Sequence, residues 1–363
     1  MEKNKKLIVF IPSIEDGGVE KNLYLIANYL SNKINKINVI TYENSKKKFF
    51  HKKIKFINPL INNIKFKSRY PKYFLCLITL FRILLLNKNC LVLCFQANIF
   101  SIILCKMLSV KIITRSNSSS EGWSQNYLKQ KIFSIFFPMA DKIIVNSYDF
   151  KREMDKRYKI NTQCILNPFD FLMIKKKSDE KIKNPFSIKK SLKLISVGRL
   201  TYQKDFITIL KAIKLIKRNV ELIILGKGNE YLNLRNFIDK KNLSKKVKLL
   251  GYKTNPFKYI KKADIFILSS IFEGSPNVLV EAQFLRKFII STNCPTGPKE
   301  ILDGGNYGEL INIKDYRHLA NIIEKFSFTK KNKRKIQYGY TNHKQYKYKL
   351  NCKKYFKLIM KFL

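Results

Sequence analysis

The chain alternates short apolar runs with longer segments in which apolar residues recur at helical spacing. In the first half, this pattern predicts strands at residues 7–11, 37–41, 90–95, 111–114 and 142–146. It predicts helices between them at residues 20–30, 73–86, 99–108 and 128–137. Such an alternation is typical of a parallel sheet that carries helices on both faces.

A second series of strands and helices follows an irregular stretch that is bounded by prolines. Strands are expected at residues 193–197, 221–225, 247–250, 265–268 and 288–291. The length of 363 residues also fits two domains. We therefore expect an α/β protein with an N-terminal domain over residues 1–167, a linker over 168–190, a second domain over 191–330 and a tail over 331–363. The tail is either a closing helix that crosses back to the first domain or a basic extension.

The stretch SSIFEGSPNVLVEA, residues 269–282, joins a predicted strand to a predicted helix. Gly274 frees the backbone, Ser275 is a good N-cap, and Pro276 suits the first helical position, where its missing N–H costs nothing. The amino end of this helix lies at the carboxyl end of a parallel strand, the usual ligand-binding edge of such sheets. Its N–H groups and dipole suit a phosphate.

Two carboxylates flank this predicted helix terminus. A phosphate would repel Glu273 and Glu281, so we expect both to accept hydrogen bonds from hydroxyl groups. A helix terminus for a diphosphate with two hydroxyl acceptors fits a nucleotide sugar. Taken singly, each residue is more often a helix-capping or a solvated glutamate.

Two further loops follow strands in the second half. The loop from Gly198 to Asp205 brings Arg199 and Lys204 to a carboxyl end, where they can neutralise a diphosphate. Most lysines of so basic a chain face solvent, so the prediction depends on the spacing and not on the charge. Gly226 and Gly228 lack the third glycine of a dinucleotide fingerprint and predict a tight turn.

These motifs resemble those of retaining glycosyltransferases of family 4, of the bacterial cell-surface polysaccharide type. EGSPNVLVEA is similar to the E-x7-E signature, residues 198–204 to the GR-x4-K element, and residues 293–300, NCPTGPKE, to a CP-S/T-GP-x-E loop. The resemblance implies the GT-B fold, in which two Rossmann-like doubly wound domains face each other across a cleft. It implies that Glu273 contacts the donor sugar, Glu281 the ribose, and Arg199 and Lys204 the donor phosphates. The whole expected donor-binding set is Gly17, Gly18, Arg199, Lys204, Gly274, Ser275, Pro276, Asn277, Val278 and Glu281.

Two loops in the first half also resemble elements of this family. Gly17 and Gly18 lie in a GGVE loop, which in the family faces the phosphates and the acceptor; alone, a Gly-Gly pair is more often a tight turn. Arg115 and Asn117 resemble an R-x-N element and are candidates for acceptor or sugar binding. The segment from Arg115 to Ser120 could equally be a plain surface loop.

The net charge of +47, from 72 basic and 25 acidic residues, predicts an anionic partner, although part of it can reflect compositional bias. Residues 46–72 interleave lysines with aromatic residues. The apolar segment after them, residues 73–86, is shorter than the roughly 20 residues that span a bilayer. This region is either a solvated basic face followed by a buried helix, or a surface that contacts anionic lipid.

The three histidines lie outside the motif loops, and no D-x-D pair follows a strand, so we expect no metal, no cofactor and no histidine-activated nucleophile. The resemblance implies transfer with retention of configuration, with Glu273, Arg199 and Lys204 as catalytic residues. The expected reaction moves a hexose or N-acetylhexosamine from a nucleotide-diphosphate sugar, with UDP favoured, to a glycan acceptor that is lipid-linked.

Seven scattered cysteines and a short apolar run after the first lysines indicate a cytoplasmic protein without a signal peptide. From the basic residues 46–72 and the apolar segment after them, we expect peripheral attachment to the inner face of the cytoplasmic membrane. Two alternatives remain. A basic nucleic-acid-binding protein would explain the charge but not residues 269–282, and we expect no nucleic-acid partner. A sugar-nucleotide epimerase of similar architecture would need acid and base groups that these loops lack.

Overall fold

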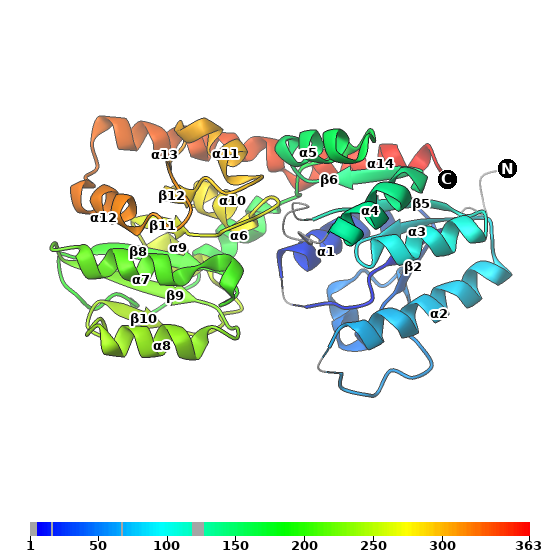
Figure 1. Cartoon of the computed structure of the whole chain (residues 1–363), viewed down its shortest axis with the longest axis horizontal. Helices are drawn as coiled ribbons and strands as arrows, with labels where there is room; N and C mark the ends of the chain where they lie inside the picture. Colours follow the sequence, from blue (N-terminus) through cyan, green and yellow to red (C-terminus); the bar gives the residue numbers. More distant parts are fainter. Residues whose placement is uncertain (1–5, 16, 67, 118–126) are drawn as a thin grey trace. The chain divides into compact units, whose positions relative to one another are not determined.

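The computed structural model describes residues 6–15, 17–66, 68–117 and 127–363 (Figure 1). The chain divides into two units. The first contains Met1–Phe169 and Tyr346–Leu363, and the second contains Asp170–Gln345. Each unit is a parallel sheet with helices packed against it, so the expected α/β class with two doubly wound sheets is confirmed.

The first unit has a seven-stranded sheet in the order β3-β2-β1-β4-β5-β6-β7. Its strands are β1 (Lys6–Phe10), β2 (Lys36–Ile40), β3 (Lys55–Ile57), β4 (Cys90–Cys94), β5 (Lys111–Arg115), β6 (Lys142–Val145) and β7 (Gln163–Cys164). Its α-helices are α1 (Gly18–Ser31), α2 (Tyr70–Leu86), α3 (Asn98–Met107), α4 (Tyr127–Phe136), α5 (Tyr148–Tyr158) and α14 (Tyr348–Met360). All strand pairs are parallel, because a helix or loop crosses over between neighbours.

The second unit has a six-stranded sheet in the order β10-β9-β8-β11-β12-β13. Its strands are β8 (Leu192–Val197), β9 (Val220–Leu225), β10 (Val247–Leu249), β11 (Ile265–Leu268), β12 (Phe288–Thr292) and β13 (Glu309–Ile311). Its α-helices are α6 (Phe171–Ser178), α7 (Phe206–Leu215), α8 (Tyr231–Lys240), α9 (Phe257–Lys262), α10 (Asn277–Phe284), α11 (Pro298–Ile301), α12 (Tyr316–Lys325) and α13 (Lys330–Asn342).

Both faces of each sheet are buried, which explains why the central strands are apolar without alternation. In β11, the side chains of Ile265 and Ile267 join the core that α7 and α12 cover, and Phe266 on the opposite face is also fully buried. In β1, Leu7 and Val9 pack in the core beneath α1 and α14. The apolar pattern of the sequence is therefore a pattern of two-sided burial.

The predicted strands are present, with ends that differ by at most about one residue. The sequence pattern missed β3, β7 and β13, which are two or three residues long and lie at or next to the sheet edges. Strands this short carry no periodicity that could identify them.

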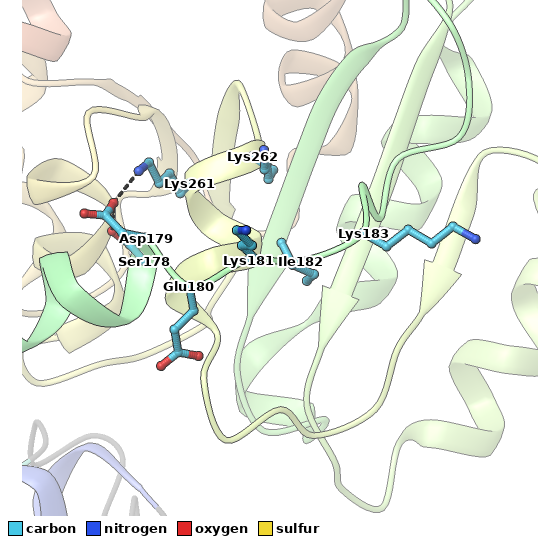
Figure 2. Close-up of a pocket in the computed structure, with 8 residues that line it drawn as sticks. All are labelled: Ser178, Asp179, Glu180, Lys181, Ile182, Lys183, Lys261 and Lys262. Carbon is cyan, nitrogen blue, oxygen red and sulfur yellow. Dashed lines mark hydrogen bonds and ion pairs between the residues drawn. The ribbon is translucent and has the colours of Figure 1, made fainter.

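Residues 168–190, predicted as a linker, include a helix that belongs to the second unit. Helix α6 packs against α9, and Asp179, just after α6, forms an ion pair with Lys261 of α9 (Figure 2). The segment from Ser178 to Lys183 borders a hollow of about 580 Å³ beside α9. The boundary between the units lies between Phe169 and Asp170, near the start of the predicted linker.

The predicted tail, residues 331–363, forms most of α13 and all of α14. Helix α13 packs against α10 in the second unit, whereas α14 packs against α1 in the first. The buried residues of α14, including Tyr355 and Ile359, face the core of the first sheet. This segment is therefore part of a folded core and not a basic extension.

Within the described ranges, no helix combines the length and the apolar character that a membrane span needs. Helix α2 has 17 residues, and it begins three residues before the predicted segment.

Candidate functional site

The polar residues of the second unit gather where the strand order of its sheet reverses, between β8 and β11. In open parallel sheets, ligands bind at the carboxyl ends of the strands next to such a reversal. Strand β8 leads into the loop that carries Arg199 and Lys204. Strand β11 leads into the loop that carries Glu273. The two loops predicted from separate motifs are therefore neighbours.

Lys204 and Glu273 contact each other directly, although 69 residues separate them in the chain. The Lys204 ammonium forms an ion pair with Glu273 Oε1, and both side chains are largely buried. Ser270 donates a second hydrogen bond to the same carboxylate oxygen at 2.6 Å. The carboxylate and the ammonium are thus held in one orientation beside the amino end of α10.

Hydrogen bonds to backbone carbonyl groups hold these two loops together. The Ile271 N–H donates to the Gln203 carbonyl at 2.9 Å, and the Ser269 hydroxyl donates to the Lys204 carbonyl at 2.8 Å. On the other side, the Thr296 hydroxyl donates to the Glu273 carbonyl at 2.7 Å. Ser269, Ser270 and Thr296 lie within or beside the predicted motifs, but no local pattern showed that they position the loops.

Helix α10 begins one residue later than predicted. Its N-cap is Pro276, whose extended backbone precedes the first helical residue Asn277, and no side chain caps this end. The N-cap position is therefore occupied by Pro276, one residue after the predicted Ser275. The helix terminus instead packs against the following loop, where a Cβ on Gly297 would lie 2.4 Å from the Gly274 carbonyl oxygen. Gly297 also has φ of +86°, which favours glycine.

The other predicted donor-site residues differ in exposure. Glu281 is 2% exposed and lies within α10, four residues after its start. Arg199 is exposed in its loop, whereas Asn277 and Val278 are half-buried in the first turn of α10. Backbone N–H groups in the first turn of a helix have no acceptor within the helix. The described residues thus combine an exposed guanidinium, a helix terminus and two buried carboxylates in one unit.

Burial, reinforced by the nearby Glu273 carboxylate, raises the pKa of the Cys294 thiol to about 12. Cys294 is 3% exposed. A thiol with this pKa stays protonated near neutral pH, so it is not activated as a nucleophile.

The turn with Gly226 and Gly228 packs closely against the backbone of the loop that carries Arg199. A Cβ on Gly226 would lie 1.8 Å from the Gly198 carbonyl oxygen, and one on Gly228 would lie 2.1 Å from that of Leu200. The Leu200 N–H donates to the Lys227 carbonyl at 2.9 Å. The two glycines therefore serve close backbone packing.

Gly226→Ala is expected to displace the Arg199 loop and to destabilise the second unit by about 1–3 kcal/mol, because the new methyl group would meet backbone that cannot rotate away. Chemical denaturation measures this loss. Gly198→Ala is the matched control, since its Cβ would make only ordinary contacts with the Lys204 side chain, the nearest at 3.5 Å. Equal stability of the two variants would contradict the packing role.

In the first unit, the loop after β1 leads into α1, with Gly17 as its N-cap. The buried Glu20 carboxylate accepts hydrogen bonds from the Gly17 and Glu15 N–H groups at 3.1 and 3.3 Å. Burial raises the pKa of Glu20, against the opposing effect of these backbone bonds. Glu20 thus shapes the loop that carries Gly17 and Gly18.

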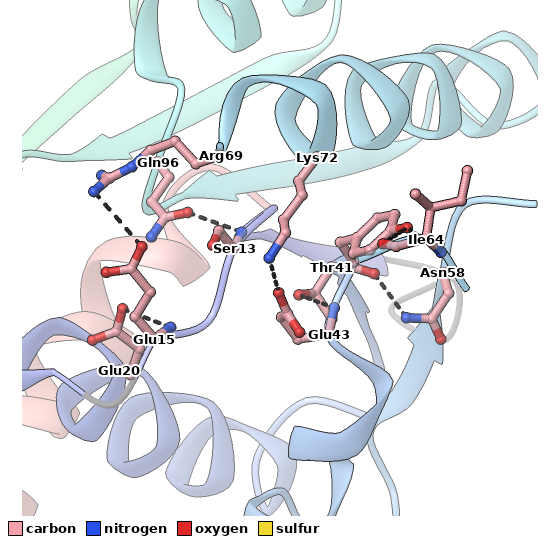
Figure 3. A network of polar contacts seen from close by, with 11 residues as sticks. Ser13, Glu15, Glu20, Thr41, Glu43, Asn58, Ile64, Arg69, Lys72 and Gln96 are labelled. Carbon is pink, nitrogen blue, oxygen red and sulfur yellow. Dashed lines mark hydrogen bonds and ion pairs between the residues drawn. The ribbon is translucent and has the colours of Figure 1, made fainter. Parts of the chain in front are cut away.

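Further polar side chains lie near the carboxyl ends of β1 and β4 in the first sheet (Figure 3). Gln96, after β4, accepts from the Ser13 N–H at 3.0 Å. Arg69, at the start of α2, lies 3.6 Å from the Glu15 carboxylate, and both are half exposed. These contacts join the loops after β1 and β4, which flank the reversal point of this sheet.

Arg115 is fully buried, so the alternative of a plain surface loop is wrong at this position. Its guanidinium donates to the Tyr355 hydroxyl at 2.8 Å, to Asn167 Oδ1 at 2.6 Å and to Asn117 Oδ1. These contacts tie β5 to α14. Asn117 is half-buried, and Ser118, Ser119 and Ser120 of the predicted loop lie outside the described residues.

No group of three or more His, Cys, Asp or Glu side chains with metal-binding geometry occurs in the part of the chain that the structure describes.

Comparison with known proteins agrees with this arrangement. Residues 177–342 match the family model "Glycosyl transferases group 1". An uncharacterized glycosyltransferase of Methanocaldococcus jannaschii is 35% identical over 178 residues, 47% of this chain and 44% of that protein. The amylovoran biosynthesis glycosyltransferase AmsD of Erwinia amylovora is 27% identical over 316 residues, 83% and 85% of the two chains.

A Campylobacter jejuni N-acetylgalactosaminyltransferase, named for a diphospho-undecaprenol-linked substrate, is 29% identical over 57% of each chain. The structure of HepE from Anabaena in complex with UDP superimposes with a TM-score of 0.81 at 16% identity and covers 98% of this chain and 100% of that one. The fold is therefore that of the GT-B glycosyltransferases.

Part of the second unit is thus similar to group 1 glycosyl transferases, and one relative of the chain is named for amylovoran biosynthesis. The matched segment spans about half the length of the Methanocaldococcus and Campylobacter relatives.

Proposed function

We propose that this protein transfers a hexose or N-acetylhexosamine from a nucleotide-diphosphate sugar to a lipid-linked glycan, with retention of anomeric configuration. The observation that carries the proposal is the ion pair between Lys204 and Glu273 beside the amino end of α10, at the reversal point of the second sheet. Such a site offers cations and helix N–H groups to phosphates and carboxylates to hydroxyl groups.

Each residue has a separate role in this proposal. Lys204 and the exposed Arg199 bind the diphosphate together with the first turn of α10, and Glu273 binds hydroxyl groups of the sugar. Glu281 accepts hydrogen bonds from the ribose. In the first unit, the Gly17 and Gly18 loop and Asn117 are the predicted contacts with phosphates and acceptor. Arg115, being fully buried, holds Asn117 in position.

Catalysis in this proposal is electrostatic. As the bond to the sugar breaks, negative charge grows on the departing nucleoside diphosphate, and the fixed cations stabilise it without reorganisation. The Glu273 carboxylate lies next to the sugar that acquires positive character. The departing phosphate takes the proton of the acceptor hydroxyl, so the protein supplies no general base.

Transfer is expected to persist in a chelator, because Lys204, Arg199 and the helix terminus supply the positive charge that a metal ion supplies in other transferases. Assays in EDTA, with and without added Mg²⁺ or Mn²⁺, measure this. Complete loss of activity that either cation restores would contradict metal-independent transfer.

A panel of nucleotide sugars scored by thermal shift tests the donor. A ligand that binds the folded state raises the free energy of unfolding by RT ln(1 + [L]/Kd). We expect UDP-sugars to raise the Tm most, in line with the UDP bound to HepE. A panel in which no nucleotide sugar shifts the Tm would overturn the donor assignment.

The proposal includes a lipid-linked acceptor and peripheral contact with an anionic membrane at the inner face of the cytoplasmic membrane. The Campylobacter relative named for a diphospho-undecaprenol substrate supports the acceptor class. In the first unit, large apolar side chains are exposed on the loop before α2 and on α2 itself: Leu60 is 86%, Tyr70 75% and Phe74 65% exposed. Between Glu43 and Asp141 the sequence has a single acidic residue, Glu121, so this region has a strong excess of positive charge.

The protein is expected to sediment with vesicles that contain anionic lipid and to be released at about 1 M salt, because screening then acts within a few Å. Vesicles of zwitterionic lipid alone are the control and should retain much less protein. Extraction that needs detergent at every salt concentration would contradict peripheral attachment.

A further inference from the structure

A hollow of about 520 Å³ lies at the amino ends of β1, β2 and β3 in the first unit. Gly17 and Asn117, in contrast, follow the carboxyl ends of β1 and β5, at the other end of the strands. Four lysines and four asparagines line the hollow together with one isoleucine, and none of these described residues is acidic. The hollow is therefore separate from the residues assigned to glycosyl transfer.

The strand register directs several of these lysines to one face of the sheet. Lys6 of β1 is the direct partner of Lys36 in β2, and Lys55 of β3 is the partner of Asn38. Side chains two residues apart in a strand share a face, so Lys36 and Asn38 point the same way. Like charges directly opposite each other are destabilising. Neither Lys6 nor Lys55 forms an ion pair with any described residue.

Asn38 adds a hydrogen-bonding group to the hollow. Its side chain is 7% exposed and borders the hollow. Among the described residues, no group forms a hydrogen bond with its amide. Buried amides are almost always satisfied by a protein group, water or ligand. The Asn38 amide is therefore available to donate a hydrogen bond to an anion that the lysines of the hollow attract.

We propose that this hollow is a second binding site, for a small phosphate-bearing anion. Lys6, Lys36 and Lys55 neutralise its charge, and the Asn38 amide donates a hydrogen bond to a phosphate oxygen. The anion is either a soluble diphosphate or sugar phosphate, or the head group of an anionic lipid. The site goes beyond the proposed transfer reaction and does not depend on it.

Titration with inorganic pyrophosphate in a calorimeter tests the site. The full-length Arg199→Ala/Lys204→Ala variant is the background, because it removes the cations of the donor site. We expect one binding event that the further change Lys36→Gln/Lys55→Gln weakens about tenfold or more, since charged hydrogen bonds are lost. Lys353→Gln/Lys357→Gln on the exposed face of α14 removes the same charge from the same unit and should leave the affinity unchanged.

The variant Asn38→Leu tests the contribution of the amide to binding separately from that of the lysines. It should weaken pyrophosphate binding, because the hydrogen bond from the amide to a phosphate oxygen is lost while the lysines remain. No binding in the background variant, or equal loss in the pocket and α14 variants, would overturn the site.

Sedimentation with phosphatidylglycerol vesicles distinguishes the two sources of phosphate. If the ligand is a lipid head group, Lys36→Gln/Lys55→Gln reduces vesicle binding more than the α14 control does, and pyrophosphate competes. If the ligand is soluble, both variants bind vesicles equally, while only the pocket variant loses pyrophosphate.

Discussion

Lys204→Ala is expected to reduce kcat as well as donor affinity, with a loss of roughly 3–4 kcal/mol in transition-state stabilisation, comparable to removing one oxyanion donor. The contact of Lys204 with the diphosphate strengthens as charge develops on the leaving group. The variant also leaves the buried Glu273 carboxylate without its ammonium partner, so the sugar contact loses its fixed orientation. Steady-state kinetics with varied donor measure both parameters, and an unchanged kcat would contradict the assignment.

Glu281→Gln is the comparison for this variant. Glu281 is assigned to the ribose, whose charge does not change during the reaction, so its loss should act on donor KM more than on kcat. Nucleoside alone should bind normally to Lys204→Ala and more weakly to Glu281→Gln. Equal loss of nucleoside binding in both variants would show that these two roles are wrong.

Glu221→Ala is expected to destabilise the second unit by about 1–3 kcal/mol, because backbone N–H groups lose the buried carboxylate that accepts from them. The Glu221 carboxylate is fully buried, lies 2.6 Å from the Lys248 ammonium, and accepts from the Ser187 and Ile188 N–H groups at 2.8 Å each. It therefore fastens the chain before β8 to strand β9. Urea denaturation measures the loss, and Glu230→Ala on the surface is the control.

The same carboxylate predicts a dependence on pH. Burial alone would raise the pKa of Glu221, but the hydrogen bonds from Lys248 and from two backbone N–H groups lower it below its ordinary value. A lowered pKa means that its contribution is present above the unfolded-state pKa and is lost as pH falls through the folded-state pKa. The stability difference between the wild type and Glu221→Ala should therefore shrink in acid; a constant difference would contradict this role.

Much of the fold could be predicted from the sequence because both sheets bury two faces. The central strand β11 is apolar throughout, and β8 and β9 are mostly apolar. A run of this kind between helical segments is distinctive. The edge strand β3 has only three residues, so it carries no such signal. Helix α6 was not predicted, because its sequence is charged and has no strong apolar period. The helix is buried by packing against α9, which the local sequence does not show.

The candidate site was predictable as far as it depends on strand ends. The rule that parallel strands present their carboxyl ends at one edge predicted that the Lys204 and Glu273 loops meet. It did not predict that the two side chains pair, nor that Ser270 holds the carboxylate, because those contacts depend on loop conformation. Arg115 shows the same limit: its partner Tyr355 lies 240 residues away in α14, and no local pattern connects them.

The most direct test of the central claim is a transfer assay with the purified chain, a labelled UDP-sugar panel and a polyprenyl-diphosphate-linked glycan. The account predicts that one UDP-sugar extends the acceptor by one residue, that NMR shows the anomeric configuration of the donor in the product, and that Lys204→Ala abolishes most of this extension. Failure of every nucleotide sugar to extend an acceptor, together with tight binding of the chain to nucleic acid, would contradict the claim.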